Sequence, residues 1–263
     1  MVGFETLELS IHGPVGRIVL DRPDAMNALS PRMLHELLRS LGDLESRDDV
    51  RVVVLEGKGP AFSVGFDLQA MGSLMMSGGL PGESEVRELA ELGEAVVSAL
   101  VRCEKITVAS VHGYAIGGGF LLMTACDVRL VSRNTKFSIP EVDIGIPLLW
   151  GGVPLLVREL GPGLARDLVM SCRRFGADTL EALNAGFRIV DESERVGACE
   201  SLVEELGAKP PLAMRITKKQ FLQACGLLQT GDHQKDADHC VSAMLHPDFL
   251  STAMAYLQRL GGK

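Results

Sequence analysis

The stretch His112-Gly113-Tyr114-Ala115-Ile116-Gly117-Gly118-Gly119 decides how the fold of this chain is interpreted. It follows an apolar, strand-like run, Ile106–Val111, and it opens an apolar segment of helical character, Gly118–Cys126. Glycine lets a backbone approach a ligand without a Cβ in the way. The N-terminus of a helix adds unpaired N–H groups and the positive end of its dipole. A strand, a glycine turn and a helix in this order indicate a binding site for an oxyanion or a phosphate.

The spacing of these glycines does not match two common phosphate-binding motifs. Gly113 and Gly117-Gly118-Gly119 lack the G-x-G-x-x-G spacing of dinucleotide-binding folds, and no acidic residue ends a following strand in the right register. No Gly-Lys-Ser or Gly-Lys-Thr follows, so the stretch is not a P-loop. Taken alone, a glycine triplet at such a junction also fits a purely structural role.

A second segment, Ala61–Leu68, has the sequence Ala-Phe-Ser-Val-Gly-Phe-Asp-Leu and places one glycine between a strand-like run and a short helix. Two main-chain donors directed at one oxygen make an oxyanion hole, often the largest electrostatic contribution to catalysis at a carbonyl. Glu141, in Ile139-Pro140-Glu141, is the candidate base if its carboxylate reaches that hole. The same glutamate also fits a surface residue after a turn.

The composition restricts the class of protein. Of the 263 residues, 46% are hydrophobic and 23% charged, as in ordinary globular proteins. The formal charge is −8 and no long Lys/Arg run is present, so nucleic acid is not an expected partner. No apolar run reaches the ~18 residues of a membrane span, and the N-terminus lacks a secretory signal pattern. We therefore expect a soluble, cytoplasmic protein.

The cysteines form neither a CxxC pair nor a metal-ligand spacing with the histidines. We expect them to be reduced, buried small residues, and we expect no metal site. The six are Cys103, Cys126, Cys172, Cys199, Cys225 and Cys240.

Strand-like and helical runs alternate up to about residue 190, which indicates an α/β fold. The expected strands are Thr6–Ile11 and Arg17–Leu20, joined as a hairpin, then Val50–Leu55, Ile106–Val111 and Val128–Ser132. The expected helices are one opened by Ser30-Pro31, then Glu83–Arg102, Gly118–Cys126 and Thr179–Ala185.

The rest of the chain contains helical patterns and no strand. These patterns are Arg195–Leu206, Leu212–Leu228, His233–Leu245 and Pro247–Leu260. We therefore divide the chain into a core, residues 1–194, that carries the site, and a helical C-terminal region, residues 195–263. Residues 71–81, rich in Gly, Ser, Met and Pro, are expected to be a flexible loop, either simply exposed or lining an adaptable apolar tunnel.

Together these segments carry a resemblance that none of them carries alone. The chain resembles the crotonase (enoyl-CoA hydratase/isomerase) superfamily over nearly its whole length. The matching pieces occur in the family's order and are Asp21–Leu29, Ala61–Leu68, Val111–Gly119, Ala125–Arg129, Phe137–Ile146, Phe175–Gly186 and Val190-Asp191.

The resemblance implies a fold and a ligand. The fold would be a spiral of ββα units, and the C-terminal helical region would serve in trimerisation, giving a trimer or a dimer of trimers. The ligand would be an acyl-CoA thioester. Coenzyme A is then part of the substrate, so no separate cofactor is expected.

The resemblance also implies binding residues. The thioester oxygen would lie between the N–H groups of Phe66 and Gly118. Val64, Phe66 and Leu68 would line the path of the pantetheine and adenine, with Ala28 nearby. Asp67 belongs to the same CoA-binding segment, although a capping or backbone-pairing role suits it as well, and the same structural role is expected of Asp127.

One phosphate contact of the family is in doubt, because Gln69 stands where many relatives carry lysine. Arg22, Lys58 or Lys105 are the candidates to supply that positive charge.

The acid and base groups distinguish between reactions within the family. The hydratases that this chain resembles use two glutamates, and here one position holds Leu121 while the other holds Glu141. Leu149 stands where relatives that hold a catalytic water tend to have glycine, and where the dehalogenases have a nucleophilic aspartate. A single glutamate resembles the Δ3,Δ2-enoyl-CoA isomerases. By that resemblance, Glu141 would remove a C2 proton and return it to C4 of the dienolate.

The surroundings of Glu141 should tune its proton affinity. Burial among Leu121, Leu148, Leu149 and Trp150 is expected to raise its pKa towards neutrality, which suits proton transfer.

Two alternatives remain open. Enoyl-CoA hydratase activity would need an acid from elsewhere, with Glu88, Glu91 and Glu94 on the long helix as candidates. A family member that binds acyl-CoA or a partner protein without turnover is the other. A serine hydrolase is not expected, because Ser63 lacks a G-x-S-x-G elbow and His112 lacks triad partners.

Overall fold

The computed structural model describes residues 3–68, 82–183, 186–226 and 236–261. The loop expected at residues 71–81 lies outside this range, and so does Gln69. Within the range, no helix is both long enough and apolar enough to span a bilayer.

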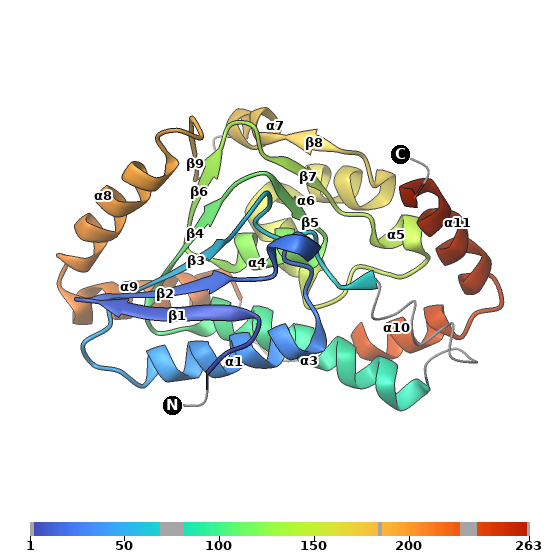
Figure 1. The fold of residues 1–263 in the computed structure, drawn as a ribbon, viewed down its shortest axis with the longest axis horizontal. Coiled ribbons are helices and arrows are strands. Elements are labelled where there is room, and N and C mark those ends of the chain that lie inside the picture. The colour runs from blue at the N-terminus through green and yellow to red at the C-terminus, as the bar shows by residue number, and fades with distance from the viewer. Residues whose placement is uncertain (1–2, 69–81, 184–185, 227–235, 262–263) are drawn as a thin grey trace.

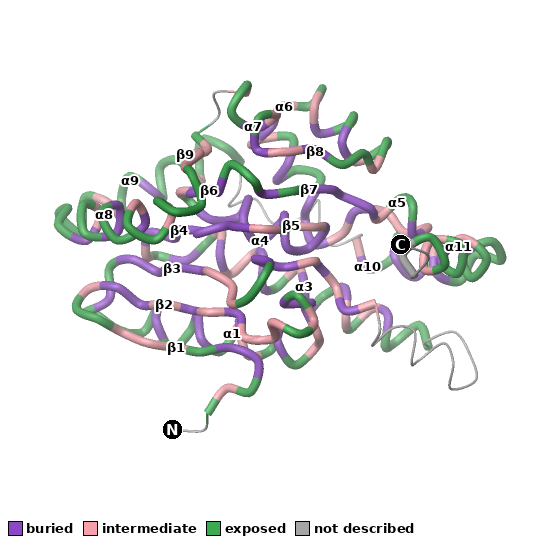
Figure 2. Tube along the Cα trace, turned by 45° about the horizontal axis from the view of Figure 1, so that its top comes forward, coloured by how far each residue is buried: buried purple, intermediate pink, exposed green. Residues whose placement is uncertain are grey.

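A six-stranded sheet with the order β1-β2-β3-β4-β6-β9 forms the centre of the molecule (Figure 1). The first two strands pair antiparallel as a hairpin, and every later neighbour pairs parallel. Every residue of β4 is buried (Figure 2), as expected of a parallel strand covered by helices on both faces. The strands are β1 (Leu7–His12), β2 (Val15–Leu20), β3 (Val52–Gly57), β4 (Ile106–Val111), β6 (Val128–Ser132) and β9 (Phe187–Val190).

A smaller sheet holds the glycine stretch. It consists of β5 (Tyr114–Ile116), β7 (Lys136–Ser138) and β8 (Phe175–Gly176), in the order β5-β7-β8. Phe120, Phe137 and Phe175 pack together behind it, with ring centroids 5.3–5.6 Å apart. This aromatic cluster attaches the small sheet to the helix that follows the glycines.

The helices of the first part of the chain cover the sheets. Ser30 caps the first of them by accepting a hydrogen bond from the N–H of Met33. The elements are η1 (Pro23–Ala25), α1 (Pro31–Glu45), α3 (Glu83–Arg102), α4 (Gly118–Ala125), α5 (Glu141–Ile144), α6 (Gly152–Ser171) and α7 (Ala177–Ala182).

Four helices form the C-terminal region: α8 (Arg195–Gly207), α9 (Pro211–Ala224), α10 (Asp236–Met244) and α11 (Phe249–Gly261). Cys199, Leu202 and Val203 of α8 pack on the large sheet. The buried Lys218 of α9 donates to Asp127 at 2.6 Å. In contrast, α10 packs on α3 and α11 packs on α5, at the right of Figure 1. The last two helices therefore lie on the side of the molecule that carries Glu141.

Most of the expected elements are confirmed, including the α/β class, the hairpin, the long helix Glu83–Arg102 and the helical C-terminal region. The strand expected at Val50–Leu55 is displaced by two residues, to Val52–Gly57. The sequence patterns do not predict helix α6, because Gly161 and Pro162 interrupt its periodicity; Gly161 has a φ of 77° and marks a kink. The division at residue 194 stays a prediction.

The cysteine expectation is wrong at two positions. Cys103, Cys126, Cys199 and Cys240 are buried and free, but Cys172 is only half-buried and Cys225 is exposed.

Candidate active site

The two glycine segments meet across a short bridge between Ser63 and Ala115. The N–H of Ser63 donates to the carbonyl of Tyr114, and the N–H of Ile116 donates to the carbonyl of Ser63, both at 3.0 Å. Gly65 follows with a φ of +82°, and a Cβ there would lie 2.6 Å from the carbonyl oxygen of Ile116. This close approach requires glycine at position 65.

Two main-chain donors are left unpaired where the segments meet. The N–H of Leu29 donates to the carbonyl of Gly65 at 2.8 Å, and the carbonyl of Leu29 accepts from the N–H of Asp67 at 3.2 Å. Because Leu29 bonds to the residues on either side of Phe66, the N–H of Phe66 points away from Leu29. Gly118 is the first residue of α4, where an N–H has no acceptor within the helix. Among the described residues neither N–H donates to a protein acceptor.

The N–H groups of Phe66 and Gly118 lie in the same part of the structure. A Cβ on Gly65, the residue before Phe66, would lie only 3.2 Å from the nitrogen of Gly118. The structure thus brings together the two segments from which the sequence predicts an oxyanion hole.

Glu141 lies against the glycine stretch. Gly117 adopts φ +50° and ψ −120°, a conformation open in practice only to glycine, and its N–H donates to the carbonyl of Ser138 at 2.9 Å. A Cβ on Gly117 would come 2.6 Å from Oε1 of Glu141. The carboxyl group is therefore in contact with the residue next to Gly118.

Burial dominates the electrostatics of Glu141. The residue as a whole is half-buried, but its Oε2 is buried and has no hydrogen-bond partner within the described part of the chain. Burial raises the pKa of this carboxyl to about 7, opposed only by a hydrogen bond from its own backbone N–H. The raised pKa expected from the sequence is confirmed, and such a group can both accept and release a proton near neutral pH.

Apolar residues lie around the start of α4, next to one of the two donors. Leu121, Leu148 and Trp150 are buried in one cluster, and Leu149 is half-buried beside it. The indole of Trp150 lies directly against Gly118, where a Cβ would be 2.3 Å from Cζ3. Leu121 is 2% exposed, so the position of the second glutamate of the hydratases is a closed apolar one here.

The CoA-binding positions predicted from the sequence lie in the segment Ala61–Leu68 and, for Ala28, in the stretch that bridges to it through Leu29 and Phe66. Ala28 is buried, and Val64 and Leu68 are half-buried. Asp67 is buried and forms an ion pair with Arg22 at 2.8 Å, while Arg22 also donates to the carbonyl of Ala28. Asp67 thus has a structural partner, and that partner is a side-chain cation, whereas a backbone group was expected.

The candidate cations for phosphate binding already have protein partners. Arg22 pairs with Asp67, and Lys58 pairs with Glu8 and Asp21. Lys105 donates to the carbonyl of Arg47. None of the three approaches Glu141 through a hydrogen bond or ion pair in the described residues.

The candidate second acids lie on α3. Glu88 and Glu91 are exposed and Glu94 is half-buried. None of them donates to Oε2 of Glu141, which has no partner within the ranges that the structure describes. Among the described residues, no three His, Cys, Asp or Glu side chains gather in a way that could hold a metal ion.

Asp127 and His112 have structural partners. Asp127 accepts hydrogen bonds from the N–H and hydroxyl of Thr107, as its expected structural role requires. Nε2 of His112 contacts the carbonyl of Gly59 at 2.8 Å, and no serine pairs with it in the described residues.

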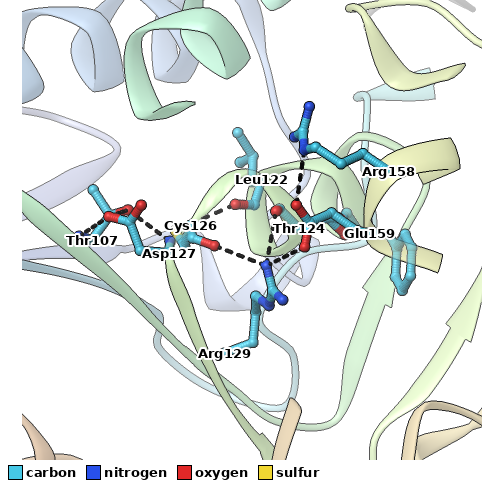
Figure 3. Close-up of polar contacts among 9 residues, drawn as sticks. Thr107, Leu122, Thr124, Cys126, Asp127, Arg129, Arg158 and Glu159 are labelled. Atoms are coloured by element: carbon cyan, nitrogen blue, oxygen red, sulfur yellow. Dashed lines mark hydrogen bonds and ion pairs between the residues drawn. The ribbon is translucent and has the colours of Figure 1, made fainter. Parts of the chain in front are cut away.

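Arg129 fixes the far end of the helix that begins at Gly118. Its Nη1 donates to the carbonyl of Cys126 at 3.2 Å, at the C-terminal end of α4, and to Oε2 of Glu159 on α6 at 2.8 Å (Figure 3). Arg158 donates to the other oxygen of Glu159. The side chain of Arg129 is buried, so this network joins α4 and α6 in the interior.

Sequence reasoning missed three residues near the site. Gly93 of α3 lies against Trp150, and Oδ2 of Asp236 accepts from the N–H of Gly151 at 2.9 Å. Tyr256 of α11 has a raised pKa, caused first by burial and then by the negative charge of Glu141. These contacts join residues that are far apart in the sequence, and no local sequence pattern predicts them.

The chain is similar to known proteins over most of its length. The family model described as enoyl-CoA hydratase/isomerase matches residues 10–260. A peroxisomal Δ(3,5)-Δ(2,4)-dienoyl-CoA isomerase of Arabidopsis thaliana is 32% identical over 233 residues, covering 85% of this chain and 84% of the relative. A short-chain-enoyl-CoA hydratase of Clostridium acetobutylicum is 32% identical over 214 residues, covering 80% and 78%.

A solved structure is similar over the same length. It is that of an enoyl-CoA hydratase candidate from Thermobifida fusca YX in complex with CoA, with a TM-score of 0.76 and 31% identity. The match covers 98% of this chain and 95% of the other.

Proposed function

This chain belongs to the enoyl-CoA hydratase/isomerase family, and we propose that it is an acyl-CoA enzyme that isomerises a 3-enoyl-CoA to a 2-enoyl-CoA. The observation that carries the proposal is the buried, unpaired carboxyl oxygen of Glu141 beside the glycine stretch, as the described residues show it. The carboxyl group lies in contact with Gly117, and no second carboxyl group is bonded to it among the described residues.

The main chain holds the thioester in this proposal. The carbonyl oxygen accepts hydrogen bonds from the N–H groups of Phe66 and Gly118, which have no protein acceptor within the described residues. The pantetheine and adenine then follow the segment that contains Val64 and Leu68, with Ala28 nearby. These N–H groups are already positioned where negative charge develops on the oxygen, so they stabilise the enolate more than the neutral thioester.

Glu141 moves the proton. Its carboxylate removes a proton from C2, the electrons delocalise into the thioester, and the dienolate oxygen rests between the two N–H groups. The same carboxyl group then delivers the proton to C4, so the double bond moves and no atom is gained or lost. A pKa of about 7 makes both the ionised and the protonated forms of Glu141 accessible during this cycle.

Hydration is the competing reaction, and one relative carries the name of a hydratase. It requires water to be positioned and deprotonated while C2 is protonated. Leu121 presents a buried side chain with no proton to exchange. A hydratase mechanism would therefore need Glu88, Glu91 or Glu94 to enter the site. The third possibility is a protein that binds acyl-CoA without turnover.

We also propose that the chain self-associates as a trimer or a dimer of trimers. Large apolar side chains on α6 and α9 are exposed in the single chain, namely Val153, Val157, Met170, Leu212, Ile216 and Phe221. Exposed apolar side chains on two helices are candidates for contacts between subunits. A cytoplasmic location stays a prediction.

A paired assay of wild type and Glu141→Gln tests the proposed reaction. One arm supplies a 3-enoyl-CoA and follows the absorbance of the conjugated 2-enoyl thioester, and the other supplies a 2-enoyl-CoA and follows its loss. Asp143→Asn, an exposed carboxylate two residues along the same short helix, is the matched control. We expect isomerisation that Glu141→Gln abolishes and Asp143→Asn retains, with negligible hydration. Efficient hydration by wild type would overturn the single-carboxylate mechanism, and inactivity in both arms with binding retained would favour a binding protein.

A further inference from the structure

The only tryptophan of the chain, Trp150, lies between two glycines of two different helices. A Cβ on Gly93 of α3 would come 1.9 Å from Cε2 of the indole, and a Cβ on Gly118 of α4 would come 2.3 Å from Cζ3. The indole can occupy this position only because neither residue has a side chain. One end of the ring system therefore rests on α3 and the other on the residue whose N–H faces the site.

The backbone at Trp150 is held in an unfavourable conformation. Trp150 has a φ of +61° and Gly151 a φ of +64°, and bulky residues rarely adopt such values. A conformation of this kind persists where the surroundings over-determine it.

The carboxylate of Asp236 supplies one of these restraints. Its Oδ2 accepts a hydrogen bond from the N–H of Gly151 at 2.9 Å, across 85 positions of sequence. Asp236 is the first residue of α10, and the next turns of that helix bury Ala237, Cys240 and Val241 against Val86 and Ala90 of α3. Helix α10 of the C-terminal region thus holds the turn at Trp150 and Gly151 in place.

We propose that Trp150 determines which acyl groups the site accepts, and that Asp236 is the positioning residue that holds it there. The proposal rests on the proposed function, since it takes the thioester to bind at the N–H of Gly118. An acyl chain anchored at that N–H must pass the indole that covers the same residue. The substrate class that we infer is a short, unbranched acyl thioester, because an indole packed between Gly93 and Gly118 restricts the space for a longer or branched chain beside Gly118.

The first experiment uses the single tryptophan as a reporter. The full-length protein is titrated with CoA, butanoyl-CoA and decanoyl-CoA, which are saturated and do not turn over, while the emission of Trp150 is recorded. We expect butanoyl-CoA to change the emission and CoA alone to leave it nearly unchanged. Binding of butanoyl-CoA seen by calorimetry without any change in emission would overturn the proposal, because the indole would not then border the acyl group.

The second experiment removes the indole. Dissociation constants for butanoyl-CoA and decanoyl-CoA are measured by calorimetry for wild type, Trp150→Phe and Trp150→Ala. We expect the preference for the short chain to fall by about tenfold or more in Trp150→Ala, within the range that apolar contacts discriminate, and by less in Trp150→Phe. An unchanged ratio would overturn the proposal while leaving the proposed reaction to its own assay. Absence of acyl-CoA binding by wild type would overturn both.

The third experiment tests the positioning residue. Asp236→Ala removes the acceptor for the N–H of Gly151, whereas Asp236→Asn keeps an oxygen that can accept it. Asp238→Asn, on the same helix, alters only a pair with Arg87 at 2.6 Å and serves as the matched control.

We expect Asp236→Ala to shift the Trp150 emission to longer wavelength, to increase its quenching by acrylamide and to weaken the short-chain preference. Asp236→Asn should retain most of the wild-type behaviour, and Asp238→Asn all of it. Circular dichroism establishes that each variant is folded. Unchanged Trp150 emission and chain preference in folded Asp236→Ala would overturn the role of Asp236.

Discussion

Gly117 and Glu141 are in direct contact: a Cβ on Gly117 would come 2.6 Å from Oε1 of the carboxyl group. The glycine stretch therefore does two things at this point. It leaves the N–H of Gly118 unpaired at the start of α4, and it makes room for the carboxyl group beside it. The contact places the carboxyl group of Glu141 against the residue next to Gly118, the proposed oxyanion donor.

Gly117→Ala should consequently damage both function and stability. The new methyl group would collide with Oε1, and a φ of +50° with a ψ of −120° is strained for any residue with a side chain. We expect a loss of at least about 100-fold in kcat/KM and a decrease of about 1–3 kcal/mol in the free energy of unfolding. Enzyme kinetics and urea unfolding measure the two effects.

Gly197→Ala is the control for that variant. Gly197 is exposed in α8, and the position that a methyl group would take there has nothing within 4 Å. Alanine should therefore preserve activity and add about 0.5–1 kcal/mol to stability. Wild-type activity in Gly117→Ala would show that the carboxyl group does not need its observed position.

The raised pKa of Glu141 predicts how stability depends on pH. In the folded protein the pKa is about 7, against 4.5 for the free side chain, so between these values the folded state binds more protons than the unfolded state. The contribution of Glu141 to the free energy of unfolding is therefore fully present below about pH 4.5. As the pH rises to about 7, the free energy of unfolding falls by about 3 kcal/mol in total.

Glu141→Gln should remove this dependence. The variant should match wild type near pH 4 and be the more stable protein at pH 8, by up to about 3 kcal/mol in urea unfolding. Activity of wild type should move the opposite way, rising through about pH 7 as the carboxylate forms. Equal stability of the two proteins at pH 8 would mean that Glu141 is not buried as the structure has it.

The fold around the site was predictable where a local pattern specifies it. The strand Ile106–Val111 and the helix that opens at Gly118 were each expected within a residue or two, but the short strand Tyr114–Ile116 between them was not. The environment of Glu141 was predictable for a similar reason, because Leu148 and Trp150 lie close to it in sequence and both are buried.

Contacts between distant segments were not predictable from one sequence. In the sequence alone, Asp236 is an ordinary acidic residue near the start of a helix. The packing of α10 on α3 brings it to Gly151. Arg22 was a candidate for phosphate binding, but the fold pairs it with Asp67. In both cases the partner is decided by tertiary packing, which propensity and periodicity do not encode.

Phe66→Ala should retain most of the catalytic rate. The predicted catalytic role of residue 66 belongs to its N–H, whose direction follows from the bridge between Leu29 and Phe66, and the half-buried phenyl ring packs on the core. We expect kcat to stay within about tenfold of wild type, since loss of an oxyanion-hole donor costs about 100–1,000-fold. A steady-state comparison with a 3-enoyl-CoA measures it, and a fall in kcat of about 100-fold with an unchanged denaturation midpoint would contradict a main-chain role.

Leu121→Glu asks whether one side chain separates isomerase from hydratase chemistry. Leu121 is 2% exposed and occupies the position where the hydratases of this family carry a glutamate, so the variant would introduce a second carboxyl group into the apolar enclosure. We expect hydration of a 2-enoyl-CoA to become measurable, while burial of a new ionisable group lowers stability by about 1–3 kcal/mol. Leu121→Gln, which has nearly the same shape without an exchangeable acid, should suffer a similar loss of stability without gaining hydration. Should both variants hydrate equally, or should wild type already hydrate well, the missing carboxyl group at position 121 would not be what restricts this site to moving a double bond.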